Sequence, residues 1–502
     1  MTVSAPYLEK LSELLALRMG ISFPQERRAD LERGIIAVAG ELGCPNPESC
    51  IEMLISSPLT KGHLEALAGS FTTGETYFFR EAGSFGILER EVLPDLIRRR
   101  REDKRIRIWS AGCATGEEPY SIAILLSRLM PDITEWDITI LATDVNPRSL
   151  AKAVQGVYGN WSFRDVPAWV KEGYFRKKAD SRFEVLRRVR EMVTFSCHNL
   201  AADAYPSLAN NTNAMDMIFC RNVLMYFAEE AEMQVIRQFS RSLVEGGWLV
   251  VGPCETSKAL REEFSTPAFP GGVFYRKPSG KEKQTHDNLF RLEDAKGRAA
   301  GLDAPFFRSE AAEFALGEKA AATPVLTPAS VPEERTGNLP RPADSYAEAC
   351  RFYAEGLYTD AEAKLLALLE AEPGNLPAMS LLARVYANEG RLLEALPWSE
   401  KAVAEDKMDP EHHYLRATIL EEQGRAEDAA EALRRALYLE PDFVIAYFAL
   451  GNLSRRQGRL REAGKYFQNA LTLLGRQAKD EIVPGSDGLT AGRMIEIILA
   501  II

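Results

Sequence analysis

The chain has 502 residues, of which 46% are hydrophobic and 26% charged, and its formal net charge is −11. These values are typical of a globular chain with roughly two to four domains, and the acidic balance argues against nucleic acid as the main partner. No apolar run is long enough to span a bilayer, the seven cysteines have no metal-ligand spacing, and the first residues lack signal-peptide features. We therefore expect a cytoplasmic protein with no membrane insertion and no metal site.

The first 70 residues have the pattern of short helices. Apolar residues recur three and four positions apart over 8–17 and over 31–42, as on one face of an amphipathic helix. We expect residues 1–70 to form a small all-α domain.

Residues 71–277 alternate strand and helix patterns, which predicts βαβ units and a mostly parallel sheet. The strand candidates are 106–110, 138–143, 193–196, 215–220, 248–252 and 272–276. Residues 154–190, rich in aromatic and basic side chains, do not fit this alternation, and we expect a small antiparallel β insertion there. The predicted fold of the region is a doubly wound α/β domain.

A cluster of basic residues leads into the first strand. It consists of Arg98, Arg99, Arg100, Arg101, Lys104, Arg105 and Arg107. Because the chain as a whole is acidic, we expect a solvated face here rather than a stripe that binds nucleic acid.

The first strand runs into a turn built on Gly112 and Gly116, and the next strand ends at Asp144. Glycine lets a backbone approach a ligand closely, and a strand-end carboxylate can accept hydrogen bonds from both hydroxyls of a ribose. The turn is not G-x-G-x-x-G, and Glu117 and Glu118 stand where a pyrophosphate would lie. The pattern favours a nucleoside without phosphates, with S-adenosylmethionine (SAM) as the leading candidate. A glycine turn followed by an incidental Asp is the alternative.

From 278 to 340 the composition shifts to Ala, Pro, Glu, Lys and Thr with little apolar periodicity, which predicts a flexible linker. A repeat of 34 residues follows, with glycine at the turn and small residues where paired helices meet, the signature of tetratricopeptide (TPR) repeats. Its period is kept by Gly356, Gly390, Gly424 and Gly458 and by Ala361, Ala395, Ala429 and Ala463.

We expect four TPR repeats over 341–477 and a capping helix over 478–502. Stacked helix pairs form a concave surface, which we expect to bind a further protein or peptide partner. Because a flexible linker cannot orient two domains, the array is expected to be separable from the α/β domain.

Four further segments accompany the glycine turn in a specific order: 71–81, 196–200, 216–227 and 246–252. Together with the turn they resemble the chemotaxis-receptor methyltransferases (the CheR family) over about residues 5–277. The resemblance implies that SAM donates a methyl group to glutamate side chains in the cytoplasmic domain of methyl-accepting chemoreceptors, as part of a chemosensory pathway.

This chemistry accounts for the scarcity of classical catalytic residues. A glutamate with an ordinary pKa of about 4.3 is already an anion at neutral pH, so no general base is needed and positioning suffices. The resemblance assigns catalytic roles to Arg80 and Tyr226. It places around the cofactor Gly74, Thr76, Arg80, Glu118, Asp144, Asn199, Leu200, Arg221 and Asn222.

Two features depart from the family pattern. The family motif commonly has Asn where this chain has Gly74, so we expect a lost amide contact and weaker SAM binding. In some members the β insertion binds a C-terminal receptor pentapeptide, but the turn at 177–182 is short and lacks glycine, which argues against that binding. A function of a different class stays open, that of a SAM-binding or inactive methyltransferase-like scaffold that acts through its TPR array.

Overall fold

The computed structural model describes residues 3–56, 59–72, 74–179, 181–267, 269, 272–278, 342–486 and 488–501. Apart from residue 278, the expected linker at 278–340 lies outside these residues. Within the described ranges, no helix is long and apolar enough to cross a membrane. The same ranges contain no group of three or more His, Cys, Asp or Glu side chains that could hold a metal ion.

The amino-terminal part is a bundle of four helices. They are α1 (Ala5–Met19), α2 (Arg28–Glu41), α3 (Pro47–Ser56) and α4 (Lys61–Phe71). Leu11, Leu15, Ile35 and Ile51 are fully buried in its core. Tyr226 from the α/β domain packs against the same cluster, so the bundle is joined to the rest of the chain by apolar contact.

Six strands form the central sheet. They are β1 (Arg105–Ala111), β2 (Asp137–Asp144), β6 (Val193–Cys197), β7 (Met215–Cys220), β8 (Leu243–Val251) and β9 (Val273–Arg276). Their order is β6-β2-β1-β7-β8-β9, and all neighbours pair in parallel except β8 and β9. All six strand candidates are therefore confirmed, as is the mostly parallel α/β fold.

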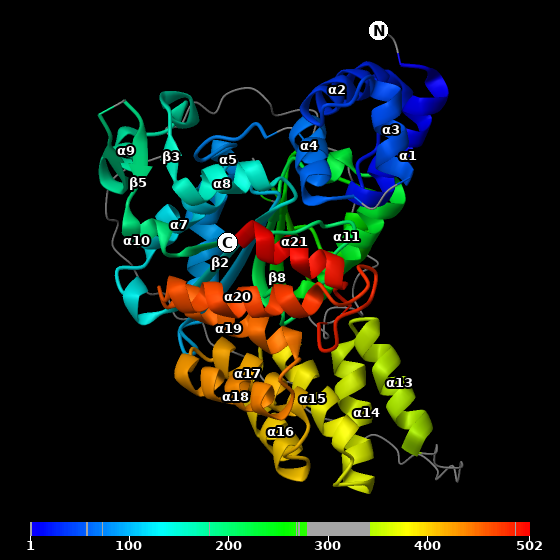
Figure 1. The fold of residues 1–502 in the computed structure, drawn as a ribbon. Helices are drawn as coiled ribbons and strands as arrows, with labels where there is room; N and C mark the ends of the chain where they lie inside the picture. The colour runs from blue at the N-terminus through cyan, green and yellow to red at the C-terminus, as the bar shows by residue number, and fades with distance from the viewer. Residues whose placement is uncertain are drawn as a thin grey trace, which may run out of the picture.

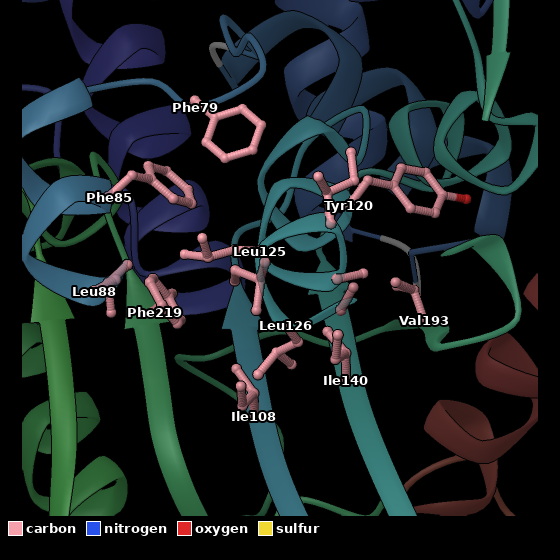
Figure 2. Close-up of a cluster of buried hydrophobic side chains, with 14 of the residues drawn as sticks. Phe79, Phe85, Leu88, Ile108, Tyr120, Leu125, Leu126, Ile140, Val193 and Phe219 are labelled. Atoms are coloured by element: carbon pink, nitrogen blue, oxygen red, sulfur yellow. The ribbon is translucent and has the colours of Figure 1, made fainter. Parts of the chain in front are cut away.

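The strands bury both faces, because successive side chains point to opposite sides. On one side Ile106 and Ile108 pack with α5 (Ala82–Ile87), α6 (Leu93–Arg99) and α7 (Glu117–Leu129). On the other, Trp109 and Ala111 pack with α11 (Glu229–Ser242) and α12 (Lys258–Glu263). Figure 2 shows the first of these cores, where Leu125 and Leu126 of α7 approach the strands.

The expected β insertion is a three-stranded antiparallel sheet of order β3-β5-β4. Its elements are β3 (Val157–Tyr158), α9 (Ala168–Tyr174), β4 (Phe175–Lys177), β5 (Phe183–Val185) and α10 (Arg187–Arg190). It follows α8 (Pro147–Gln155). Phe163 and Phe175 of the insertion pack on Phe78, with ring centroids 4.9 Å from that of Phe78 in both cases. The insertion is thus anchored to the segment that leads into α5.

Four helix pairs make up the repeat array, followed by a further helix. They are α13 (Pro342–Ala354), α14 (Tyr358–Ala371), α15 (Leu376–Asn388), α16 (Leu392–Glu405), α17 (Pro410–Glu422), α18 (Ala426–Leu439), α19 (Val444–Arg456), α20 (Leu460–Leu474) and α21 (Ala491–Ile501). The turn glycine of every pair has φ between 73° and 76°, and the alanine five residues later is buried. The TPR prediction is confirmed.

The repeat array packs on the α/β domain, contrary to the expected independence of the two. Figure 1 shows the repeats on the side of that domain away from α1–α4. Glu422 of α17 pairs with Arg105 at the start of β1, with Nη2 to Oε2 at 3.0 Å. The Asn213 amide donates to the carbonyl of Ala387 in α15 at 3.3 Å. The composition of the linker does not fix how the array is oriented on the α/β domain. These buried polar contacts between residues far apart in the sequence fix that orientation.

The basic cluster that leads into β1 is only in part the solvated face that we expected, since Arg98, Arg99 and Arg101 are exposed but the others are not. Arg107 is only 3% exposed and donates to the carbonyls of Asn211 and Asn213. Its burial lowers its pKa to about 10. Arg100 pairs with the buried Asp216, and Arg98 stays exposed. Arg100 and Arg107 thus find an acid and carbonyls on elements that sequence spacing does not bring together.

Candidate cofactor-binding and active site

A cavity opens at the carboxyl-terminal edge of the parallel strands, where the helical bundle meets the α/β domain. It is lined by every residue that the resemblance placed at the cofactor or substrate: Gly74, Thr76, Arg80, Glu118, Asp144, Asn199, Leu200, Arg221, Asn222 and Tyr226. Crevices at this edge are where open α/β sheets bind ligands.

The glycine turn forms the floor of the cavity. Gly112 and Gly116 have φ of 83° and 92°, which only glycine adopts readily. The backbone amides of Gly112 and Cys113 both donate to the carbonyl of Thr143, at 2.8 and 2.9 Å. A Cβ on Gly112 would lie 2.4 Å from a methyl of Val223. The turn is therefore bound to the end of β2 and has no room for a side chain.

Asp144 is held by the backbone on both of its oxygens. Oδ2 accepts from the amide of Ala114 and Oδ1 from the amide of Asn146, each at 2.8 Å. Burial raises the pKa of Asp144, and these amide hydrogen bonds oppose the rise. Each carboxylate oxygen keeps acceptor capacity, so the group can serve two hydroxyls from a fixed position.

Arg221 links the acids beneath the cavity. Its Nη1 lies 3.2 Å from Oε2 of Glu118, and its Nη2 lies 2.8 Å from Oε2 of Glu81. Nη2 also donates to the carbonyl of Arg80 at 2.6 Å. Glu118 accepts a further bond from Ser110, and burial raises its pKa against the opposing charge of Arg221. Arg221 therefore fixes both Glu118 and the backbone that carries Arg80.

The neighbouring acid, Glu117, has a different place. It accepts hydrogen bonds from Thr115 at 2.6 Å and from Ser162 of the insertion at 3.0 Å. Burial raises its pKa, and both hydroxyls oppose that rise. Of the two adjacent acids, Glu118 lines the cavity, whereas Glu117 ties the glycine turn to the β insertion.

Arg80 is held between two residues in the left-handed backbone region, Phe79 with φ of 55° and Glu81 with φ of 62°. Such conformations are costly for residues other than glycine and cluster at functional sites. The amide of Phe79 donates to the hydroxyl of Ser121 at 3.0 Å, and Nη1 of Arg80 donates to the carbonyl of Glu75 at 2.6 Å. The surroundings thus fix the backbone that presents this guanidinium to the cavity.

Tyr226 lies at the junction of the bundle and the α/β domain. Its carbonyl accepts from the amide of Ser22 at 2.8 Å, and the Arg27 guanidinium stands 5.4 Å from its ring centroid. Asn199 makes a second bridge to the bundle, since its side-chain amide donates to the carbonyl of Arg18. The helical bundle therefore forms one wall of the cavity.

Gly74 has open space around it. A Cβ there would meet only the Ser149 hydroxyl, at 3.8 Å, and its φ is outside the left-handed region. Neither space nor backbone conformation requires glycine, so an asparagine would be accommodated.

Sequence reasoning missed Glu255, which is 5% exposed. Its two oxygens accept from the amides of Asn222 and Val223, both at 2.6 Å, and from Gly252 at 2.7 Å. Asn222 itself has φ of 59°. Glu255 therefore supports the turn that presents Arg221 and Asn222. Asp144 was found because it is an acid at the end of a strand. Glu255 follows the end of β8 closely, so the same criterion could have found Glu255.

Apolar residues from the bundle were also missed. Met19, Ile21 and Phe71 line the cavity beside Leu200 and Phe227. Met19 and Ile21 belong to another predicted domain, and no periodicity in the sequence indicates contact between the two. Phe71 is the first residue of the predicted α/β region, but in the structure it ends α4 of the bundle. An apolar wall of this kind suits a flat heterocycle such as adenine, while the acids suit hydroxyls and positive charge.

The fold is a mostly parallel α/β domain with a cavity at the carboxyl ends of its strands, and comparison with known families assigns it to a methyltransferase class. Residues 74–270 match the family described as CheR methyltransferase, SAM binding domain, and residues 352–419 and 414–480 match tetratricopeptide repeat families. The chain belongs to the CheR methyltransferase family and carries TPR repeats.

Three relatives illustrate the similarity. Chemotaxis protein methyltransferase 2 of Vibrio cholerae is 36% identical, over 43% of this chain and 73% of its own length. The chemotaxis protein methyltransferase of Borreliella burgdorferi is 31% identical, over 52% of this chain and 92% of its own. The probable biofilm formation methyltransferase WspC of Pseudomonas aeruginosa is 27% identical, over 92% of this chain and 98% of its own. The similarity to WspC thus extends across the α/β domain and the repeats.

Proposed function

We propose that this protein transfers a methyl group from SAM to glutamate side chains in the cytoplasmic domain of chemoreceptors, forming methyl esters. The observation that carries the proposal is that Arg80 and Tyr226 line the same cavity as the glycine turn and Asp144. The groups that we assign to the cofactor and to the substrate carboxylate therefore line one cavity.

The cofactor side of the cavity has groups that match each part of SAM. Asp144 is held by backbone amides and can accept from both ribose hydroxyls. We assign the wall for the adenine to Asn199 and Leu200 and the place beside the methionyl part to Glu118, since all three line the cavity. When bound, SAM supplies a methyl group already activated by its sulfonium charge.

The substrate side needs orientation rather than proton transfer. A receptor glutamate arrives ionised at neutral pH, so no group has to remove a proton. We assign to Arg80 the pairing with one carboxylate oxygen and to Tyr226 a hydrogen bond from its hydroxyl, which together aim the other oxygen at the methyl carbon. Because the substrate is a cytoplasmic receptor domain, we place the enzyme in the cytoplasm.

We further propose that the pathway controls biofilm formation and that the repeats bind a protein of that pathway. The full-length similarity to WspC supports this output, since that relative has the repeats as well as the α/β domain. TPR arrays generally bind proteins or peptides.

The test is transfer of radiolabelled methyl groups from SAM to receptor-rich membranes, followed by treatment with base, which releases the label of a methyl ester as volatile methanol. The wild type should label the receptor in a base-labile form. Arg80→Ala and Tyr226→Phe should lower the rate by about tenfold or more with little change in melting temperature. SAM binding without any transfer would favour the scaffold alternative instead.

A further inference from the structure

The chain between β6 and β7, residues 198–214, connects the cavity to the repeat array. At its start, His198, Asn199 and Leu200 line the cavity. Toward its end, the Asn213 side chain donates to the carbonyl of Ala387 in α15. In between, Ala209 packs on the core of the last two repeats. We call this stretch the β6–β7 segment.

One contact to this segment comes from the end of the array. Arg493, in the first turn of α21, donates from Nε to Oδ1 of Asp203 at 2.6 Å and from Nη2 to Oδ2 at 2.7 Å. This is a bidentate pair, the strongest common geometry between a guanidinium and a carboxylate. The side chains are 17% and 2% exposed, so water screens the pair little. The two residues are 290 positions apart.

The same carboxylate reaches the residues at the cavity. Oδ2 of Asp203 accepts from the amide of Asn199 at 2.7 Å and lies 3.4 Å from Nδ1 of His198. The amide of Asp203 donates back to the carbonyl of Asn199 at 2.9 Å. Burial alone would raise the pKa of Asp203, but the charge of Arg493 and the bonds it receives hold that pKa below its ordinary value. Asp203 is therefore an ion that needs its partner.

We propose that Arg493 is a positioning residue of the cofactor site, acting through Asp203 on Asn199 and Leu200. The proposal rests on the SAM site put forward above. Without the guanidinium, Asp203 would be a buried charge with no cation beside it, and the segment would have to open to admit water. Opening would displace the backbone of Asn199 and Leu200, and with it the adenine wall. α21, the helix that follows the repeats, then supports the SAM site without lining the cavity.

A second contact of the array with the α/β domain serves as the control. Glu422 of α17 pairs with Arg105 at the amino-terminal end of β1, the edge of the sheet opposite the cavity. Its side chain is 7% exposed, so it is buried much like Asp203. Glu422→Gln should weaken the packing of the array on the α/β domain without disturbing the cavity. It therefore distinguishes an effect of weaker packing from an effect of displaced Asn199 and Leu200.

The experiment measures SAM affinity of the full-length protein by titration calorimetry. Arg493→Ala should raise the dissociation constant by about tenfold or more, as the loss of a partner that orients the ligands does at metal sites. Arg493→Lys keeps the positive charge but cannot form the bidentate pair, so its dissociation constant for SAM should lie between those of Arg493→Ala and the wild type. Glu422→Gln should bind SAM as the wild type does, even if its melting temperature falls.

Hydrogen exchange of residues 197–205 gives a second readout for Arg493→Lys if Arg493→Ala fails to fold. Exchange there should be faster than in Glu422→Gln. Wild-type affinity and exchange in Arg493→Lys, or wild-type affinity in a folded Arg493→Ala, would overturn the positioning role. Absence of SAM binding by the wild type would overturn the proposed function itself and this inference with it.

Discussion

Charged side chains line the cavity, and a neighbouring group holds each of them in a fixed orientation. Asp144 is held by amides and Glu118 by Arg221, so neither acid is free to move toward solvent. Buried charges without such partners would be strongly unfavourable. The cavity is thus preorganised: its groups have their orientation before a ligand enters.

Asp144→Ala should weaken SAM binding by about tenfold to a hundredfold, because hydrogen bonds to a charged group contribute about 1.5–3 kcal/mol. Titration calorimetry measures the change. Glu172→Ala, which removes an exposed acid of the insertion, should leave the affinity unaltered. Equal affinities for Asp144→Ala and wild type would show that this is not the ribose site.

Gly74→Asn should strengthen SAM binding several-fold, since the position has space for the side chain and one added hydrogen bond contributes about 0.5–1.5 kcal/mol. The same titration reports the effect, and Gly74→Ala is the matched control, because it fills the space without supplying an amide. If both variants bind SAM alike, the amide makes no contact there.

At the scale of elements, two kinds of glycine turn occur in the chain. Gly424 and Gly458 of the repeats have left-handed φ and open surroundings, whereas Gly112 has left-handed φ and a methyl of Val223 in the way of any Cβ. The turns at Gly424 and Gly458 therefore need only a conformation, and the turn after β1 needs a conformation and an empty volume. The need for an empty volume at Gly112 shows that the backbone of this turn must lie close to Val223.

Gly424→Ala should cost about 1–2 kcal/mol of stability, the usual penalty for a left-handed residue with a side chain. Gly112→Ala should cost more and should also lose SAM affinity, because the turn must shift away from Val223. Thermal unfolding and SAM titration of both variants test this. A Gly112→Ala protein as stable as Gly424→Ala, with unchanged affinity, would contradict the stated role of the turn.

At the scale of the whole molecule, the repeats and the cofactor cavity lie on different edges of one sheet and are still connected. The array contacts the amino-terminal ends of strands through Arg105 and the β6–β7 segment through Asp203. A protein that binds the repeats and shifts α21 would thereby act on the cavity. The architecture thus allows partner binding to be coupled to methyl transfer.

A chain that ends at residue 278 should melt at a lower temperature than the full chain and bind SAM more weakly by about tenfold or more, as Arg493→Ala does, because Asp203 loses Arg493. Residues 341–502 should still give a cooperative helical melt, since their helices have cores of their own. Adding the second fragment to the first should restore affinity. Undiminished SAM binding by the truncated chain would show that the array is separable after all.

Much of the molecule follows from local patterns in the sequence. The strand candidates, the β insertion and the four repeats all appear where they were predicted, because periodicity and turn glycines act over a few residues. The residues named from the family resemblance all line the cavity. Those at or just after strand ends, such as Asp144 and Arg221, meet because a parallel sheet brings these ends to one edge, whereas Gly74, Thr76 and Arg80 come from the segment between α4 and α5. The position of Asp144 at the end of β2 is the plainest case.

Only the tertiary structure decided which distant charges meet. Arg105 and Arg107 look solvent-exposed in the sequence, but Arg105 is half-buried against the repeats and Arg107 is buried against the β6–β7 segment. Arg493 is an unremarkable basic residue until α21 brings it to Asp203. Such pairs depend on how whole domains pack, and no periodicity in the sequence indicates this packing. Whether a buried ion pair is stable depends on its geometry and on the cost of desolvating both charges, not on the spacing of the two residues along the chain.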